Sequence, residues 1–129
     1  MTKFKKILLI EDDPITILVC DRILKMTDFG ETIVSKINGQ EAIDYLHTLI
    51  ELNEPLPDVI FLDINMPVMN GWDFLNEYNL IDYKLNTYPK IYILSSTADP
   101  EDTKKATSYN CVVGSISKPL KKEHLDAIF

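Results

Sequence analysis

The sequence predicts an α/β fold in which a doubly wound, five-stranded parallel sheet carries helices on both faces. Two observations support this prediction. Short β-branched runs alternate with segments whose apolar residues recur at helical spacing, and three of the runs are apolar throughout, as strands covered on both faces require. The chain has 129 residues, of which 46% are hydrophobic and 26% are charged, and this suits a single domain over residues 1–129.

The expected elements follow one another in a regular order. The strands are residues 7–10, 32–35, 59–62, 91–94 and 112–116. Four helices are recognised by their apolar residues, which are Ile15, Leu18, Val19, Ile23 and Met26; Ala42, Ile43, Leu46, Leu49 and Ile50; Phe74, Leu75 and Tyr78; and Leu120, Leu125 and Ile128. The helix after the fourth strand is predicted from its start, because Asp99 can cap it and Pro100 suits the first helical position.

Charge and cysteine usage exclude several classes of protein. The net charge of −7 argues against a nucleic-acid-binding surface. Cys20 and Cys111 form neither a metal motif nor a disulfide framework, so we expect a reduced, cytoplasmic setting. The four apolar residues after the basic segment 1–6 are too few for a signal peptide, and no span approaches transmembrane length, so no membrane partner is expected.

Polar residues gather at the points where the expected strands end. They are Glu11, Asp12 and Asp13 after the first strand, Asp63 after the third, Ser95 after the fourth and Lys118 after the fifth. In a parallel sheet these ends lie at one edge, where ligands bind. Oxygen ligands suit Mg²⁺. Zinc is not expected, because neither His47 nor His124 lies near a strand end, and the acidic first loop would repel a nucleotide phosphate unless a metal intervened.

Five motifs in this order resemble the receiver domain of two-component response regulators, of which the chemotaxis regulator is the best-known single-domain member. The motifs are the acidic pair Glu11-Asp12, Asp63 within Phe61-Leu-Asp-Ile-Asn-Met-Pro67, Gly71, Ser95 and Lys118-Pro119. The resemblance covers nearly the whole chain. It implies a flavodoxin-like (βα)5 fold with the strand order 2-1-3-4-5 and a cis peptide bond between Lys118 and Pro119.

The resemblance also implies roles for the residues at the strand ends. Asp63 would be the phosphoacceptor, which takes a phosphoryl group from a sensor histidine kinase or a histidine phosphotransfer protein in a Mg²⁺-dependent reaction. Glu11, Asp12, Asp63 and the backbone carbonyl of Asn65 would bind the Mg²⁺. Ser95 and Lys118 would each bind a phosphoryl oxygen.

Two further positions bear on how such a site would switch. Thr97 and the side chain of Asn65 match positions that tune the lifetime of the phosphate in the family. Many receivers carry Tyr or Phe three residues before the lysine, but this chain has Ser115 there. The aromatic part of the usual switch is therefore missing from that position.

On this interpretation the chain is a signalling protein that catalyses its own phosphorylation and dephosphorylation, rather than an enzyme with a separate substrate. No DNA-binding segment follows the last expected helix, so we expect the output to be contact with a downstream target protein or phosphate relay. The acids after the first strand could instead cap the next helix, and this role fits Asp13, which precedes Pro14, better than the pair before it.

Two other interpretations stay open at this level, and a third fails on its spacing. A haloacid-dehalogenase-type, Mg²⁺-dependent aspartyl phosphatase also uses an Asp at a strand end with a second ligand two residues later, as in Asp63-Ile-Asn65, although its nucleophile normally ends the first strand. A degenerate receiver would keep the fold for protein docking alone, an alternative that Ser115 leaves open. An EF-hand is disfavoured, because loop position six is Val68 rather than Gly and position twelve is Phe74 rather than Glu.

Overall fold

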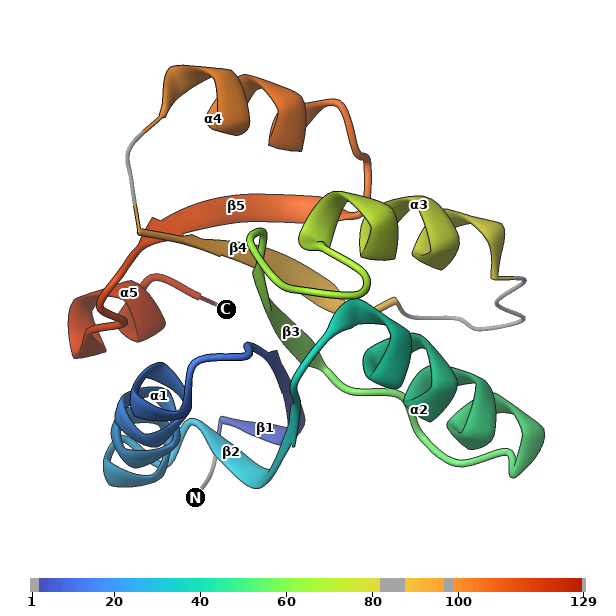
Figure 1. The fold of residues 1–129 in the computed structure, drawn as a ribbon. Coiled ribbons are helices and arrows are strands. Elements are labelled where there is room, and N and C mark those ends of the chain that lie inside the picture. Colours follow the sequence, from blue (N-terminus) through green and yellow to red (C-terminus); the bar gives the residue numbers. More distant parts are fainter. Residues whose placement is uncertain (1–2, 82–87, 97–98, 129) are drawn as a thin grey trace.

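Strands and helices alternate along the chain, as the sequence predicts (Figure 1). The structure is a computed structural model that describes residues 3–81, 88–96 and 99–128. The elements in chain order are β1 (Phe4–Ile10), α1 (Pro14–Met26), β2 (Gly30–Lys36), α2 (Gly39–Glu51), β3 (Val59–Asp63), α3 (Gly71–Leu80), β4 (Lys90–Ser95), α4 (Pro100–Thr107), β5 (Val112–Ser117) and α5 (Lys122–Asp126).

The sheet has the expected topology. All neighbouring strands are parallel, and their order is β2-β1-β3-β4-β5. Ile10 on β1 is level with Leu62 on β3, so the next residues, Glu11 and Asp63, lie side by side at the ends of these strands. The flavodoxin-like fold and strand order are therefore confirmed, and the register alone brings the first and third strand ends together.

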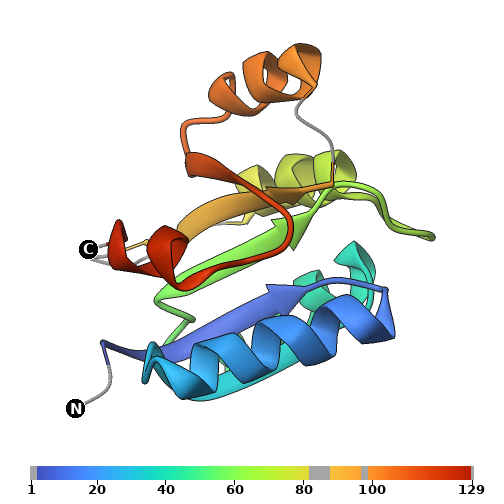
Figure 2. The ribbon, with the colours of Figure 1, turned by 90° about the vertical axis from the view of Figure 1, so that its left-hand side faces the viewer.

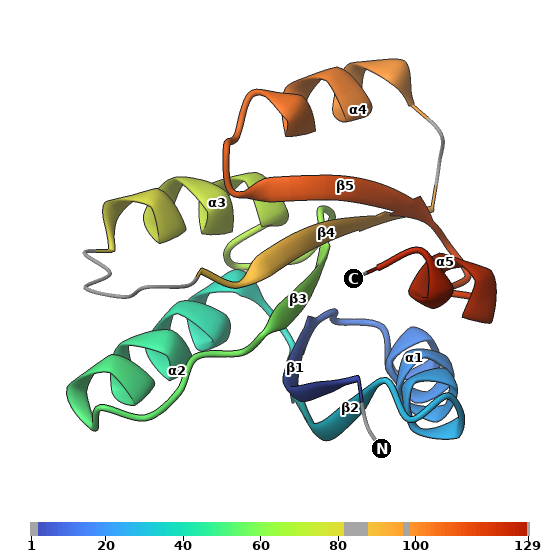
Figure 3. The same ribbon diagram turned by 180° about the vertical axis from the view of Figure 1, so that it is seen from behind.

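The helices cover both faces of the sheet. Helices α2, α3 and α4 pack on the face formed by Leu8, Ile10 and their equivalents on β3 and β4, whereas α1 and α5 pack on the opposite face, formed by Ile7 and Leu9. Figures 2 and 3 show α1 and α5 together on one side of the strands. Because side chains alternate across a strand, the fully apolar runs of β1 and β3 supply both cores at once.

Two helix starts agree with the sequence-based expectation. The side chain of Asp13 accepts hydrogen bonds from the hydroxyl and from the backbone nitrogen of Thr16, and these bonds lower the pKa of Asp13. Asp99 likewise caps α4, with Pro100 at its first position. Asp13 is therefore occupied as a cap, which separates it from the pair Glu11-Asp12.

The apolar residues that identify α1 in the sequence do not all face the core. Cys20 and Leu24 are buried against the sheet. The exposed apolar side chains, which we call the α1 strip, are Ile15, Leu18, Val19 and Met26. The helix is apolar on more than one side, so its periodicity predicts a helix without fixing which side is buried. The N-terminal end of the α1 strip lies next to the strand ends.

Candidate functional site

Three carboxylates meet at the carboxyl ends of β1 and β3. One oxygen each from Glu11, Asp12 and Asp63 lies within 4.8 Å of the others. Glu11 is only 1% exposed and Asp63 only 5%, so two of the three charges are largely removed from water. Buried like charges at this distance require a compensating cation.

Lys118 supplies one such cation. Its Nζ lies 2.7 Å from Oε2 of Glu11 and 3.4 Å from Oδ1 of Asp63. The backbone nitrogen of Lys118 donates to the carbonyl of Ser95 at 2.7 Å, which ties the end of β5 to the end of β4. The Lys118–Pro119 peptide bond is cis, as the family resemblance implies.

The ion pair affects the pKa of both Glu11 and Lys118. Burial raises the pKa of Glu11, and the negative charge of Asp63 adds to this effect, while the hydrogen bond from Lys118 opposes it. Burial alone would lower the pKa of Lys118, but the hydrogen bond to Glu11 and the charges of Glu11 and Asp63 raise it above its ordinary value. Lys118 is therefore held in its charged form between two buried acids.

The loop after Asp63 is fixed by backbone contacts. The nitrogen of Asn65 donates to Oδ1 of Asp63 at 3.3 Å, and the nitrogen of Gly71 donates to the carbonyl of Ile64 at 2.8 Å. A Cβ on Gly71 would lie 2.7 Å from the carbonyl oxygen of Asp63, so this position needs glycine for close approach. Between them Val68 has a φ of 67°, a left-handed conformation that is uncommon for a β-branched residue.

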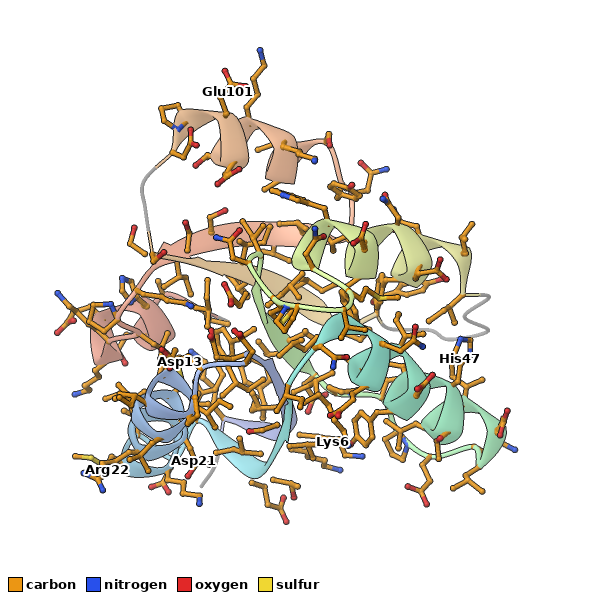
Figure 4. All side chains as sticks on the ribbon, in the orientation of Figure 1. Lys6, Asp13, Asp21, Arg22, His47 and Glu101 are labelled. Atoms are coloured by element: carbon orange, nitrogen blue, oxygen red, sulfur yellow. The ribbon has the colours of Figure 1, made fainter. Side chains whose placement is uncertain are left out.

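The structure also locates other residues that the sequence analysis singled out. Ser95 is the last residue of β4 and is half-buried, whereas Ser96 is exposed. Thr97 lies outside the described residues. Figure 4 places His47 on α2, far from Asp13 at the start of α1, and His124 accepts a hydrogen bond from the nitrogen of Lys121 within the start of α5. Neither histidine joins the acidic cluster.

A hollow beside the cluster was not anticipated from the sequence. It is lined by Ile15 and Val19 of the α1 strip, by Leu120, and by Lys118 itself. The signal that could have indicated it is the surplus of apolar residues on α1, which exceeds what one buried stripe needs.

The residues present fit a divalent metal ion. The cluster offers carboxylate oxygens, which Mg²⁺ prefers, and it contains neither sulfur nor imidazole among the described residues. Three carboxylates face the single positive charge of Lys118, so the site carries an excess of negative charge that a divalent cation would neutralise.

The sequence and the fold of this chain are similar to those of known proteins. The sequence model of the response regulator receiver domain matches residues 7–129. The crystal structure of a two-component response regulator from Cytophaga hutchinsonii superposes with a TM-score of 0.88 at 32% identity, covering 98% of this chain and 93% of that chain.

Two curated relatives extend the comparison. The probable methanogenesis regulatory protein FilR2 of Methanothrix harundinacea is 29% identical over 119 residues, which cover 92% of this chain and 75% of the relative. The cell cycle transcriptional regulator CtrA of Caulobacter vibrioides is 32% identical over 122 residues, which cover 95% of this chain and 47% of CtrA. The chain spans less than half the length of most curated relatives that it matches.

A parallel sheet in the order β2-β1-β3-β4-β5, with acids and a lysine at its strand ends, defines a signalling domain of the two-component type. The chain belongs to the response regulator receiver domain family. It is a two-component response regulator receiver, as its motifs indicate, and this membership favours that interpretation over the phosphatase and the EF-hand. No helix within the described ranges is long and apolar enough to cross a membrane.

Proposed function

We propose that Asp63 accepts a phosphoryl group from a phosphohistidine on a sensor histidine kinase or histidine phosphotransfer protein. The observation that carries the proposal is the setting of Asp63. Its carboxylate ends the central strand β3, is 5% exposed, and lies beside two further carboxylates and 3.4 Å from Lys118 Nζ. An acid that is nearly buried among acids has no structural benefit in that position, so a chemical role is the better explanation.

The transfer is an in-line displacement at phosphorus. An Oδ atom of Asp63 attacks the phosphorus atom, a P–O bond forms, and the P–N bond to the donor histidine breaks. The electron pair of that bond stays with the imidazole nitrogen, which solvent protonates. A carboxylate is a weak nucleophile, so the rate depends on positioning and on neutralising charge at the phosphoryl oxygens.

Different residues of the chain bind the phosphoryl oxygens and the metal ion. Lys118 binds one phosphoryl oxygen as a point charge, and the hydroxyl of Ser95 donates to another. Glu11, Asp12, Asp63 and the carbonyl of Asn65 would hold Mg²⁺, which when bound supplies positive charge to the transferred group. Water later attacks the phosphorus of the acyl phosphate, which releases inorganic phosphate and restores the Asp63 carboxylate.

The phosphodonor docks over the α1 strip. This exposed apolar surface borders the hollow that leads to Lys118, so a partner helix packed there would bring its phosphohistidine to the site. Docking of this kind fits a cytoplasmic protein that receives its signal from another protein. The new phosphoryl charge then shifts the receiver between two states, and the second state is recognised by a downstream target protein.

Intact-mass spectrometry after incubation with acetyl phosphate, with and without Mg²⁺, tests the proposal. We expect one phosphoryl adduct on the wild type that requires Mg²⁺ and is absent from Asp63→Asn. The matched control is Asp44→Asn, which alters an exposed carboxylate on α2 and should keep the adduct. The absence of an adduct from folded wild type would reject the proposal and favour a receiver that serves only as a docking module.

Metal binding has a separate readout. Mg²⁺ at ten times its dissociation constant should stabilise the wild type by about 1.4 kcal/mol, because it binds only the folded chain. Asp63→Asn and Asp12→Asn should each weaken this stabilisation, whereas Asp44→Asn should not. Equal Mg²⁺ stabilisation in all these variants would place the metal elsewhere.

A further inference from the structure

Helix α4 is anchored by few of its own side chains. Ala106 is its only buried residue. Apart from Pro100 the rest of the helix is polar or charged, with the sequence Pro-Glu-Asp-Thr-Lys-Lys-Ala-Thr over Pro100–Thr107. Burial of one methyl group contributes little, so other contacts must hold the helix in place.

A cluster of side chains joins the C-terminal end of α4 to α3. Nζ of Lys105 lies 4.6 Å from the centroid of the Trp72 ring. Trp72 also stacks on Tyr109, with centroids 6.0 Å apart and an angle of 18° between the rings. The hydroxyl of Tyr109 donates to Oδ1 of Asn76 at 3.0 Å. We call these four side chains the α3–α4 clamp, and Figures 1 and 3 show the turn after α4 running beside α3.

The clamp is adjacent in sequence to a residue whose backbone contacts the candidate site. Trp72 follows Gly71, whose nitrogen donates to the carbonyl of Ile64 at 2.8 Å. A Cβ on Gly71 would lie 2.7 Å from the carbonyl oxygen of Asp63, so the two backbones are in contact. A shift of the Asp63–Ile64 peptide therefore displaces the first turn of α3 and, with it, the Trp72 ring.

The position expected to link site and helix in this family is occupied by a small polar residue. Ser115 on β5 is exposed and carries no ring that could reach α4. The aromatic side chains of the clamp come instead from α3, which carries Trp72, and from the turn before β5, which carries Tyr109.

We propose that the α3–α4 clamp anchors α4 and transmits the state of the Asp63 site to it, the second part resting on the proposed phosphorylation of Asp63. The clamp lies at the surface, where a cation–π contact and a ring stack are strong enough to favour one position of a weakly buried helix. They are also weak enough to break and re-form when the helix changes position. In this chain it takes the place of the missing aromatic on β5.

Amide hydrogen exchange of the unphosphorylated protein tests the anchorage. We expect the α4 amides to exchange roughly threefold faster in Trp72→Leu and in Lys105→Met, since each removes the contact between ring and ammonium. The matched control is Lys104→Met, which alters the exposed neighbour of Lys105 on the same helix and should leave α4 exchange unchanged. Exchange in α2 should be the same in all variants, which shows that they are folded. If the α4 amides of Lys105→Met exchanged at the wild-type rate, the proposed anchorage would be overturned.

The coupling is tested on protein whose Asp63 adduct has been verified by mass. Trp72 is the only tryptophan in the chain, so its emission reports on the clamp directly. We expect both Trp72 emission and α4 exchange to change on phosphorylation of the wild type and to stay constant in Asp63→Asn. An adduct without either change would overturn the coupling. If no adduct forms, the phosphoacceptor proposal fails and the coupling that rests on it falls too, while the exchange comparison above still decides whether the clamp anchors α4.

Discussion

The ammonium of Lys118 lies 2.7 Å from Oε2 of Glu11, and this carboxylate is only 1% exposed. Glu11, the first acid of the pair Glu11-Asp12, is thus already paired with Lys118 in the unphosphorylated protein. The same lysine is 3.4 Å from Asp63, so it bridges two acids. Removing it would leave buried negative charge without a counterion.

Lys118→Met should destabilise the protein by about 3 kcal/mol at pH 7, because it leaves the Glu11 carboxylate buried and unpaired. Urea unfolding measures this, with the exposed Lys122→Met as control. Since the folded pKa of Lys118 is raised above 10.5, its contribution should be complete below that pH and should fade as the pH rises through the folded value.

The double variant Lys118→Met/Glu11→Gln separates the ion pair from simple loss of packing. Glu11→Gln removes the buried charge, so it should recover more than half of the stability lost in Lys118→Met. If the two substitutions instead cost stability independently, the pair would not be the source of the effect.

Gly71→Ala should destabilise the protein by about 2 kcal/mol and displace Asp63, because the new Cβ would lie 2.7 Å from a backbone oxygen that cannot move freely. Gly114→Ala is the matched control. There a Cβ would meet only the Tyr92 ring at 3.4 Å, which is close to ordinary contact, so the change should be within about 0.5 kcal/mol. Equal effects of the two substitutions on thermal unfolding would contradict this account of Gly71.

The sequence alone was sufficient to predict the parallel sheet and to predict which residues lie at its edge. Apolar strands predict a parallel sheet, and a parallel sheet places residues after β1, β3, β4 and β5 at one edge, so the meeting of Glu11, Asp63 and Lys118 follows from topology. The roles of these residues remain proposals. Their distances depend on side-chain packing that no periodicity reports.

Other features could not be read from local patterns. Helix α1 is apolar on more than one side, so its pattern did not reveal that Ile15 and Met26 are exposed. The stacking of Trp72 on Tyr109 joins residues far apart in the chain, and α4 gives no apolar stripe that would indicate its packing partner. The left-handed conformation of Val68 runs against the residue's own preference.

The two cysteines should differ in their reaction with a thiol reagent at pH 8. Burial raises the pKa of Cys20 to about 11, and the nearby charge of Glu11 adds to this, so its thiol is both inaccessible and protonated. Cys111 is partly exposed, and burial also raises its pKa, so it should react alone but more slowly than free cysteine. Its rate should rise about tenfold per pH unit below its pKa.

Counting reactive thiols with and without denaturant checks this difference. One thiol should react in the folded protein and two in the unfolded chain, and Cys111→Ser should remove the reaction of the folded protein. Rapid labelling of Cys20 in folded Cys111→Ser would show that the sheet face beneath α1 opens far more often than its packing indicates.

Val68→Gly should stabilise the protein, although glycine usually weakens a fold. Val68 is 84% exposed and has a φ of 67°, so it buries little and is held in a strained conformation. Relief of about 1–2 kcal/mol of strain outweighs the added entropy of the unfolded chain, for a net gain of about 0.5–1 kcal/mol in urea unfolding. Val113→Gly is the matched control, because Val113 is an exposed valine in the regular strand β5 and should lose about 1 kcal/mol. Equal losses at both positions would mean that the loop after Asp63 holds Val68 without strain, whereas opposite signs would show that the loop beside the site is retained at a cost in stability.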